Sequence, residues 1–146
     1  MTGIIAARRI VFASAAVFAA TLVAVFPAWA EPDARPSYLV FFDFEVPNLT
    51  EKAVETVAAA IARAKQEGAK SIFLVGYADG AEHHPERLSC KRARAARDIL
   101  VRGGIDSEIT IAVQGRGFYK PLGDTREREP QNRFVAIYIG VAPPGH

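Results

Sequence analysis

Cysteine is almost absent from this sequence of 146 residues: Cys90 is the only one, beside a single tryptophan and a single methionine. One thiol excludes an intramolecular disulfide, so a folded domain has to be stabilised by an apolar core, and 50% of the residues are hydrophobic. Enzyme motifs are missing as well, because the sequence contains no G-x-S-x-G, no phosphate-binding glycine loop and no Cys-His signature. These absences predict a protein that is not an enzyme and needs no cofactor.

An excess of positive charge is also missing from most of the chain. The formal net charge of +2 comes entirely from Arg8 and Arg9, since the first thirty residues carry no acid. Basic and acidic residues are therefore equal in number beyond residue 30. Proteins that bind nucleic acids present a basic surface, so this balance predicts no nucleic-acid partner.

The long hydrophobic run of the sequence lies in residues 1–30. A basic pair precedes an uncharged stretch, Ile10–Phe26, and alanines flank Trp29 in an A-x-A pattern. This arrangement predicts a signal peptide that is cleaved before Glu31. The alternative is an uncleaved anchor helix, which would attach the protein to a membrane.

Hydrophobic periodicity predicts one α/β domain at residues 38–140, between a linker at 31–37 and a flexible tail at 141–146. Strands are expected at 38–44, 70–77, 108–115 and 133–140, and helices from about 51 to 67 and from 85 to 102. The first helix is expected to begin at a cap formed by Asn48 or Thr50. Its predicted apolar positions are Val54, Val57, Ala58, Ile61 and Ala62, and the second helix carries a stripe of Ser89, Ala93, Ala96 and Leu100.

Two charged residues follow the second predicted strand. Asp79 lies just beyond the strand end, where α/β sheets tend to bind ligands, and Arg92 lies in the next helix, where long side chains lean toward the helix N-terminus. If the two groups flank an open gap, they can bind a carboxylate and an ammonium together. The alternatives are that Asp79 caps a turn or that it forms a salt bridge with Arg92.

Several longer motifs in the sequence add to the prediction for Asp79 and Arg92. They are "FFDFEVPNLT" at the first strand, "GYAD" at Asp79, "LSCKRARAARDIL" around Arg92, "GRGFYKP" after the third strand and "REPQNRFVAI" at the last strand. With these motifs, residues 38–139 resemble the OmpA-like (OmpA/MotB/Pal C-terminal) peptidoglycan-associated domain. The resemblance implies a two-layer sandwich with two main helices packed on a four-stranded mixed sheet.

The resemblance also implies a function and a location. Asp79 and Arg92 match the family residues that bind the diaminopimelate of peptidoglycan stem peptides, and Phe42, Asp43, Leu88 and Arg133 are possible supporting residues. The expected partner is peptidoglycan, with envelope proteins as further partners. The expected location is the periplasm or cell envelope of a Gram-negative bacterium, in association with the outer membrane.

Some positions depart from the family pattern. Ala78 stands in place of a threonine, Pro85 in place of an asparagine, Phe134 in place of an arginine and Ala136 in place of a glutamate, and the loop after Asp79 is about two residues shorter. The alternative function is therefore a protein interaction module that no longer binds peptidoglycan. Glu82, His83 and His84 lie in the shortened loop, but adjacent residues rarely point to one metal ion, so no metal site is expected.

Overall fold

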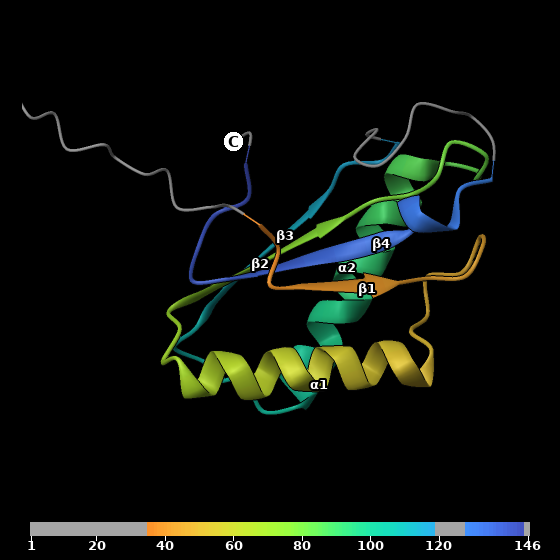
Figure 1. Cartoon of the computed structure of the whole chain (residues 1–146). Helices are drawn as coiled ribbons and strands as arrows, with labels where there is room; N and C mark the ends of the chain where they lie inside the picture. Colours follow the sequence, from red (N-terminus) through yellow and green to blue (C-terminus); the bar gives the residue numbers. More distant parts are fainter. Residues whose placement is uncertain (1–34, 119–127, 145–146) are drawn as a thin grey trace, which may run out of the picture.

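The computed structural model describes residues 35–118 and 128–144 (Figure 1). The elements are β1 (Tyr38–Phe41), α1 (Glu51–Gln66), β2 (Ser71–Gly76), α2 (Pro85–Arg102), β3 (Thr110–Gly115), the short 3-10 helix η1 (Pro130–Asn132) and β4 (Phe134–Ile139). The predicted fold class is confirmed, since two helices cover a four-stranded mixed sheet. The expected signal peptide lies outside the described residues, and none of the described helices has the length and apolarity to cross a membrane.

The strand order places several chain segments at one end of the sheet. The order is β1-β4-β2-β3, in which β4 is antiparallel to β1 and β2, and β2 is parallel to β3. Parallel strands need a crossover connection, which α2 supplies between β2 and β3. The segments that follow β1, β2 and β3 therefore meet the segment that precedes β4, at the right-hand end of the sheet in Figure 1.

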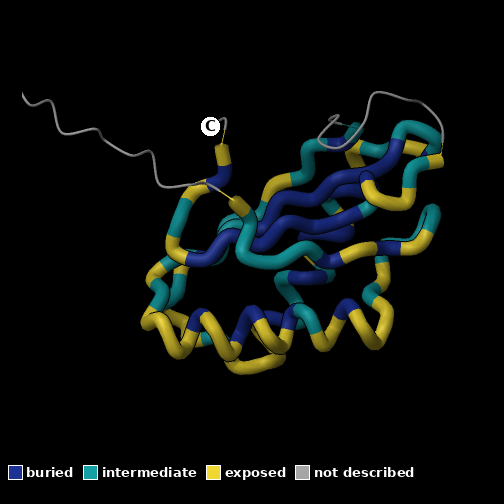
Figure 2. The backbone as a smooth tube through the Cα atoms, viewed as in Figure 1, coloured by how far each residue is buried: buried dark blue, intermediate teal, exposed yellow. Residues whose placement is uncertain are grey.

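The helix α1 packs on the sheet through a face that differs in part from the predicted one. Its buried residues are Ala53, Val57, Ala60, Ile61 and Ala64, and Figure 2 shows that the opposite side of the helix is exposed. The expected stripe is thus wrong at Val54, Ala58 and Ala62, which are exposed. Three alanines on the buried side let the helix backbone approach the sheet, so the helix is rotated toward them. The N-cap is Thr50, whose Oγ1 accepts a hydrogen bond from the Ala53 N–H at 3.2 Å.

The helix α2 is held against the sheet by glycines at the ends of β2 and β3. A Cβ atom on Gly76 would lie 2.1 Å from the Ser89 carbonyl oxygen, and one on Gly115 would lie 2.5 Å from Cys90 Sγ. Side chains at these positions would push the helix away. The predicted small-residue stripe at Ser89, Ala93, Ala96 and Leu100 is buried as expected. This close packing fixes where Arg92, on the same helix, meets the end of the sheet.

Candidate functional site

The candidate site is a buried cluster of charged side chains at the end of the sheet where β2 gives way to α2. Beyond the last residue of β2, the Tyr77 N–H still donates to the Phe134 carbonyl at 2.8 Å, and the Ala78 N–H to the Gly117 carbonyl at 3.1 Å. These bonds keep the chain in line with the sheet as far as Asp79. The loop then turns back and enters α2, which carries Arg92.

Arg92 lies at the centre of this cluster, with no exposed surface. Its Nη1 and Nη2 donate to the two carboxylate oxygens of Glu82 at 2.7 and 2.5 Å. The remaining bonds go to backbone carbonyls, from Nε to Val46 at 3.1 Å, from Nη1 to Tyr77 at 3.3 Å and from Nη2 to Asp43 at 2.8 Å. Because a guanidinium has five N–H donors, all of its hydrogen-bonding capacity is used within the protein.

Glu82 occupies the position facing the Arg92 guanidinium. Besides the two bonds from Arg92, its Oε1 accepts the Glu45 N–H at 2.8 Å and its Oε2 accepts the Asp79 N–H at 2.9 Å. The residue is 5% exposed, and its side chain is fully buried. Each carboxylate oxygen therefore receives one bond from the guanidinium and one from the main chain, a fully satisfied arrangement.

Asp79 is also fully buried, but its partner is Arg133 rather than Arg92. Its Oδ1 accepts the Ala81 N–H at 2.6 Å, and its Oδ2 accepts a bond from Arg133 Nη1 at 3.1 Å. Its backbone carbonyl accepts the Glu82 N–H at 3.2 Å. Asp79 thus caps the turn that carries Glu82, which was one of the alternatives that the sequence left open.

The four predicted supporting residues differ in how they relate to the two charge pairs, and Arg133 is itself a member of one pair. The ring of Phe42 lies under the Arg92 guanidinium, 5.3 Å from Cζ to the ring centroid, and Arg133 Nε donates to the Phe42 carbonyl at 3.3 Å. Asp43 contributes its backbone carbonyl, while its side chain is exposed. Leu88 is buried in the first turns of α2. The structure brings all six predicted residues to one end of the sheet, and their role in binding a ligand stays a prediction.

The expectation that Asp79 and Arg92 flank an open gap is wrong for this structure. Both side chains are buried, neither bonds to the other, and the carboxylate of Glu82 fills the space at Arg92. Sequence reasoning missed Glu82 because its conformation depends on a loop that periodicity does not describe. An available signal was an acidic side chain in a shortened loop, three residues after Asp79 and in reach of a helix arginine.

The loop that carries Glu82 is tied to the segment after β1 by Glu45 and His83. The Glu45 carboxylate accepts a hydrogen bond from the His83 N–H and lies 2.9 Å from His83 Nδ1. This bond from the His83 backbone is the main cause that lowers the pKa of Glu45, with smaller contributions from the charges of His83 and Arg92. Glu45 (φ 61°) and His84 (φ 50°) both have left-handed backbone, which costs a residue other than glycine about 1–2 kcal/mol.

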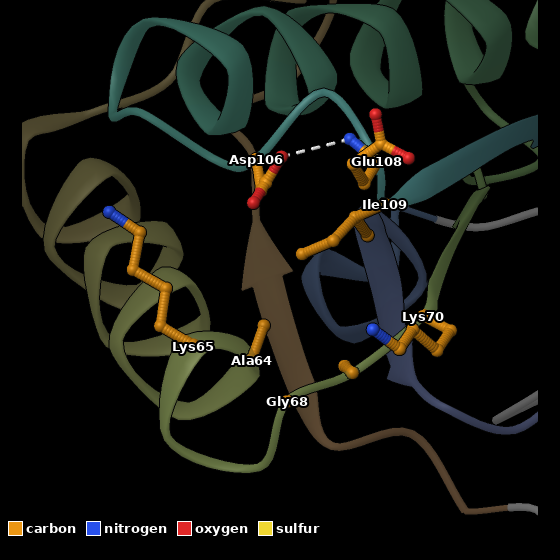
Figure 3. A pocket seen from close by; sticks show the side chains of 8 residues that line it. Ala64, Lys65, Gly68, Lys70, Asp106, Glu108 and Ile109 are labelled. Atoms are coloured by element: carbon orange, nitrogen blue, oxygen red, sulfur yellow. Dashed lines mark hydrogen bonds between the residues drawn. The ribbon is translucent and has the colours of Figure 1, made fainter.

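A hollow of about 220 Å³ lies beside this tie. Its lining residues are Glu45, Pro47, His83, His84, Arg87, Leu88 and Lys91. Another hollow, of about 200 Å³, lies at the opposite end of the sheet, between the end of α1 and the start of β3 (Figure 3). There, Lys65 and Lys70 are exposed, and Asp106 accepts the Glu108 N–H at 3.0 Å. Of these two hollows, only the first adjoins the candidate site, and its lining includes two α2 cations, Arg87 and Lys91, beside the Glu45 carboxylate.

The fold and the cluster define a two-layer α/β domain with a buried guanidinium and carboxylate centre at one end of a mixed sheet. The sequence matches the OmpA family over residues 41–134, and the chain belongs to this family. It is 36% identical over 118 residues to a protein named "Outer membrane protein" from Gluconacetobacter diazotrophicus, an alignment that covers 74% of this chain and 31% of that protein. The chain therefore spans about a third of the length of that relative.

Solved structures show the same fold. The OmpA-like domain of FopA1 from Francisella tularensis has a TM-score of 0.62 at 27% identity, over 69% of this chain and 70% of that one. The peptidoglycan-associated lipoprotein from Burkholderia pseudomallei has a TM-score of 0.61 at 22% identity, over 75% and 97% of the two chains. OmpA-like domains are non-catalytic and typically bind peptidoglycan. The relatives of this chain are proteins of the outer membrane and the periplasmic envelope.

Proposed function

We propose that this chain is a peptidoglycan-binding module of the cell envelope, and that Arg92 and Asp79 recognise the diaminopimelate of stem peptides. The observation that carries the proposal is the arrangement of donors around Arg92, where a guanidinium fork and two backbone N–H groups surround one carboxylate. Diaminopimelate presents a carboxylate and an ammonium on the same carbon atom. The carboxylate binds the donors around Arg92, and the ammonium binds the carboxylate of Asp79.

The remaining residues of the site complete this binding mode. Phe42 supports the guanidinium from below, and Arg133 orients Asp79 through the bond at 3.1 Å. The exported protein meets peptidoglycan in the periplasm of a Gram-negative bacterium, after removal of residues 1–30. N-terminal sequencing of the exported protein tests this part of the proposal, with Glu31 expected as the first residue.

A pull-down with purified sacculi tests the binding. Wild-type protein is expected to sediment with sacculi that contain diaminopimelate, and not with sacculi that carry lysine at that position, because lysine lacks the second carboxylate. Asp79→Asn and Arg92→Lys each remove one charge-assisted contact of about 1.5–3 kcal/mol, so each variant should bind about tenfold or more weakly. Arg97→Ala is the matched control on α2, since Arg97 pairs with Asp98 on the surface. Circular dichroism establishes that each variant is folded.

A second candidate function is a protein interaction module without peptidoglycan binding. The observation that favours it is the saturation of both site charges by the protein itself, Arg92 by Glu82 and Asp79 by Arg133. Under this alternative, wild-type protein stays in the supernatant with either type of sacculus. Retention that is equal in the wild type, Asp79→Asn and Arg92→Lys would also contradict the proposed recognition of diaminopimelate.

A further inference from the structure

We infer that Glu82 is an internal ligand of a carboxylate-binding cradle, and that an external carboxylate binds there by displacing it. The cradle consists of the Arg92 guanidinium and the backbone N–H groups of Glu45 and Asp79. That the cradle accepts a free carboxylate is independent of the proposed function. The further claim, that Glu82 sets the affinity for peptidoglycan, rests on the proposed function.

The cradle has the composition of a receptor site. Four donors converge on one carboxylate at 2.5–2.9 Å, two from the guanidinium and two from the main chain. Three further carbonyls and the ring of Phe42 hold the guanidinium in place from the sides that Glu82 does not contact. The guanidinium and the Glu45 N–H belong to segments other than the loop of Glu82, and the guanidinium keeps its bonds to three backbone carbonyls when the side chain at residue 82 is removed.

Glu82 is well placed to leave the cradle. It lies in the loop between β2 and α2, outside both elements, and the two residues that follow it, His83 and His84, are exposed. Left-handed backbone at His84 and at Glu45, on the two sides of the loop contact, is a source of strain that opening can relieve. The hollow of about 220 Å³ begins at Glu45 and His83 and provides space beside the loop.

Displacement has a thermodynamic consequence for any ligand. A site that is open only in a minor fraction of molecules binds its ligand more weakly by that same fraction. Glu82 therefore lowers the affinity of the cradle and selects ligands that bring additional contacts. The lining of the hollow carries two cations, Arg87 and Lys91, against the one carboxylate of Glu45, and this excess of positive charge favours an anionic ligand over a neutral one.

Removal of the internal ligand, followed by its replacement with a free carboxylate, tests the inference. In Glu82→Ala the cradle loses its occupant, and sodium formate is the smallest carboxylate that can take its place. The melting temperature of Glu82→Ala is expected to rise with formate concentration, by roughly 5 °C or more at about 0.1 M. Wild-type protein should show no such rise, and sodium chloride at the same ionic strength should not reproduce it.

Two further variants keep the test decisive. Glu82→Gln serves where Glu82→Ala does not fold: its amide nitrogen is a donor that faces donors, so formate should replace the amide and raise the melting temperature of this variant too. Arg92→Met in the Glu82→Ala background removes the guanidinium, and the formate effect should disappear.

The outcomes separate this inference from the proposed function. A formate effect in Glu82→Ala or Glu82→Gln that depends on Arg92 supports the cradle, even where no variant sediments with sacculi. Absence of the effect in a folded variant overturns the inference, as does an equal effect of chloride, whatever the sacculus result. Where wild-type protein binds sacculi, Glu82→Ala should bind about tenfold more tightly, and unchanged binding would overturn the gating role of Glu82.

Discussion

Arg92 carries a full positive charge at a position with no exposed surface. A charge is tolerated in a protein interior only when it is paired and hydrogen bonded, and both conditions are met here by Glu82 and three backbone carbonyls. Removal of one partner of such a pair leaves the other charge buried and unpaired. The energetic role of the two side chains can therefore be separated only by comparing single and double substitutions.

Arg92→Met should lower the free energy of unfolding by about 3–5 kcal/mol, because Glu82 loses the countercharge that stabilises its carboxylate in the interior. Urea denaturation followed by circular dichroism measures the loss. The matched control is the double variant Glu82→Leu with Arg92→Met, which removes both charges and fills the space with apolar atoms. It should lose less than Arg92→Met alone, and an equal or greater loss in the double variant would contradict a role based on charge pairing.

The lowered pKa of Glu45 predicts that the contact between Glu45 and the loop of His83 depends on pH. Its pKa is lowered in the folded protein, chiefly by the bond from the His83 N–H. A carboxylate with a lowered pKa contributes stability above its unfolded pKa of about 4.3, and the contribution is lost as the pH falls through the folded pKa. The amide resonance of His83 should therefore shift in an acidic step below about pH 4.3, measured by NMR. Glu45→Gln should abolish that step, and a midpoint at or above about pH 4.3 would be inconsistent with the tie.

At the scale of elements, the position of the site depends on how closely α2 approaches the sheet. Gly76 is the last residue of β2, and a Cβ atom there would collide with the backbone carbonyl of Ser89, which belongs to α2. A carbonyl in a helix cannot turn aside as a flexible side chain can. Any side chain at Gly76 therefore moves α2, and with it Arg92.

Gly76→Ala should destabilise the domain by about 1–3 kcal/mol through this overpacking and should loosen the bonds between Arg92 and Glu82. Amide hydrogen exchange at Glu45 and Asp79, whose N–H groups bond to Glu82, should accelerate. Gly68→Ala is the control, because Gly68 lies in the turn between α1 and β2 and none of the surrounding atoms lies within 4 Å of its added Cβ. The control should lose stability through its left-handed backbone alone and leave exchange at those two amides unchanged.

The elements were predictable where one local pattern decided them. The α2 bounds follow from Pro85 at its start and the glycines at its end, and the strands follow from their apolar runs, to within a few residues. The α1 face was not predictable from large residues alone, because the helix turns its alanines toward the sheet. The gathering of Asp79 and Arg92 at one end of the sheet was predictable from strand end and helix direction.

The pairing inside the site was not predictable in the same way. Glu82 reaches Arg92 through a loop in which His84 has left-handed backbone, and it meets the N–H of Glu45, which has the same conformation. Glycine is the residue that most often signals such backbone; histidine adopts it more often than most other residues do, but glutamate at position 45 gives no such signal. Tertiary contacts, and not local sequence preference, set the conformation of this loop. The contact between Glu82 and Arg92 could therefore be found only in the three-dimensional structure.

At the scale of the whole molecule, the sheet separates two different surfaces. One face packs under both helices through residues such as Leu74 and Ile137, and the other carries a second apolar cluster that includes Val75 and Tyr138. Val141 packs against this second cluster, and Pro143 is buried beside an apolar hollow of about 250 Å³ that Phe73 and Val75 also line. The expected boundary between the domain and a flexible tail at residue 141 stays a prediction, although Pro143 packs against the sheet.

Pro143 and Pro144 offer a matched test of this packing. Pro143→Ala should lower the free energy of unfolding by about 1–2 kcal/mol, because it removes buried methylene groups from the second face. Pro144 is exposed, and Pro144→Ala relaxes the unfolded chain to the same extent while it removes no buried surface. The difference between the two variants, measured by urea denaturation, therefore isolates the packing of Pro143 on the sheet. Equal effects of the two substitutions would mean that the packing of Pro143 adds nothing to the stability of the fold.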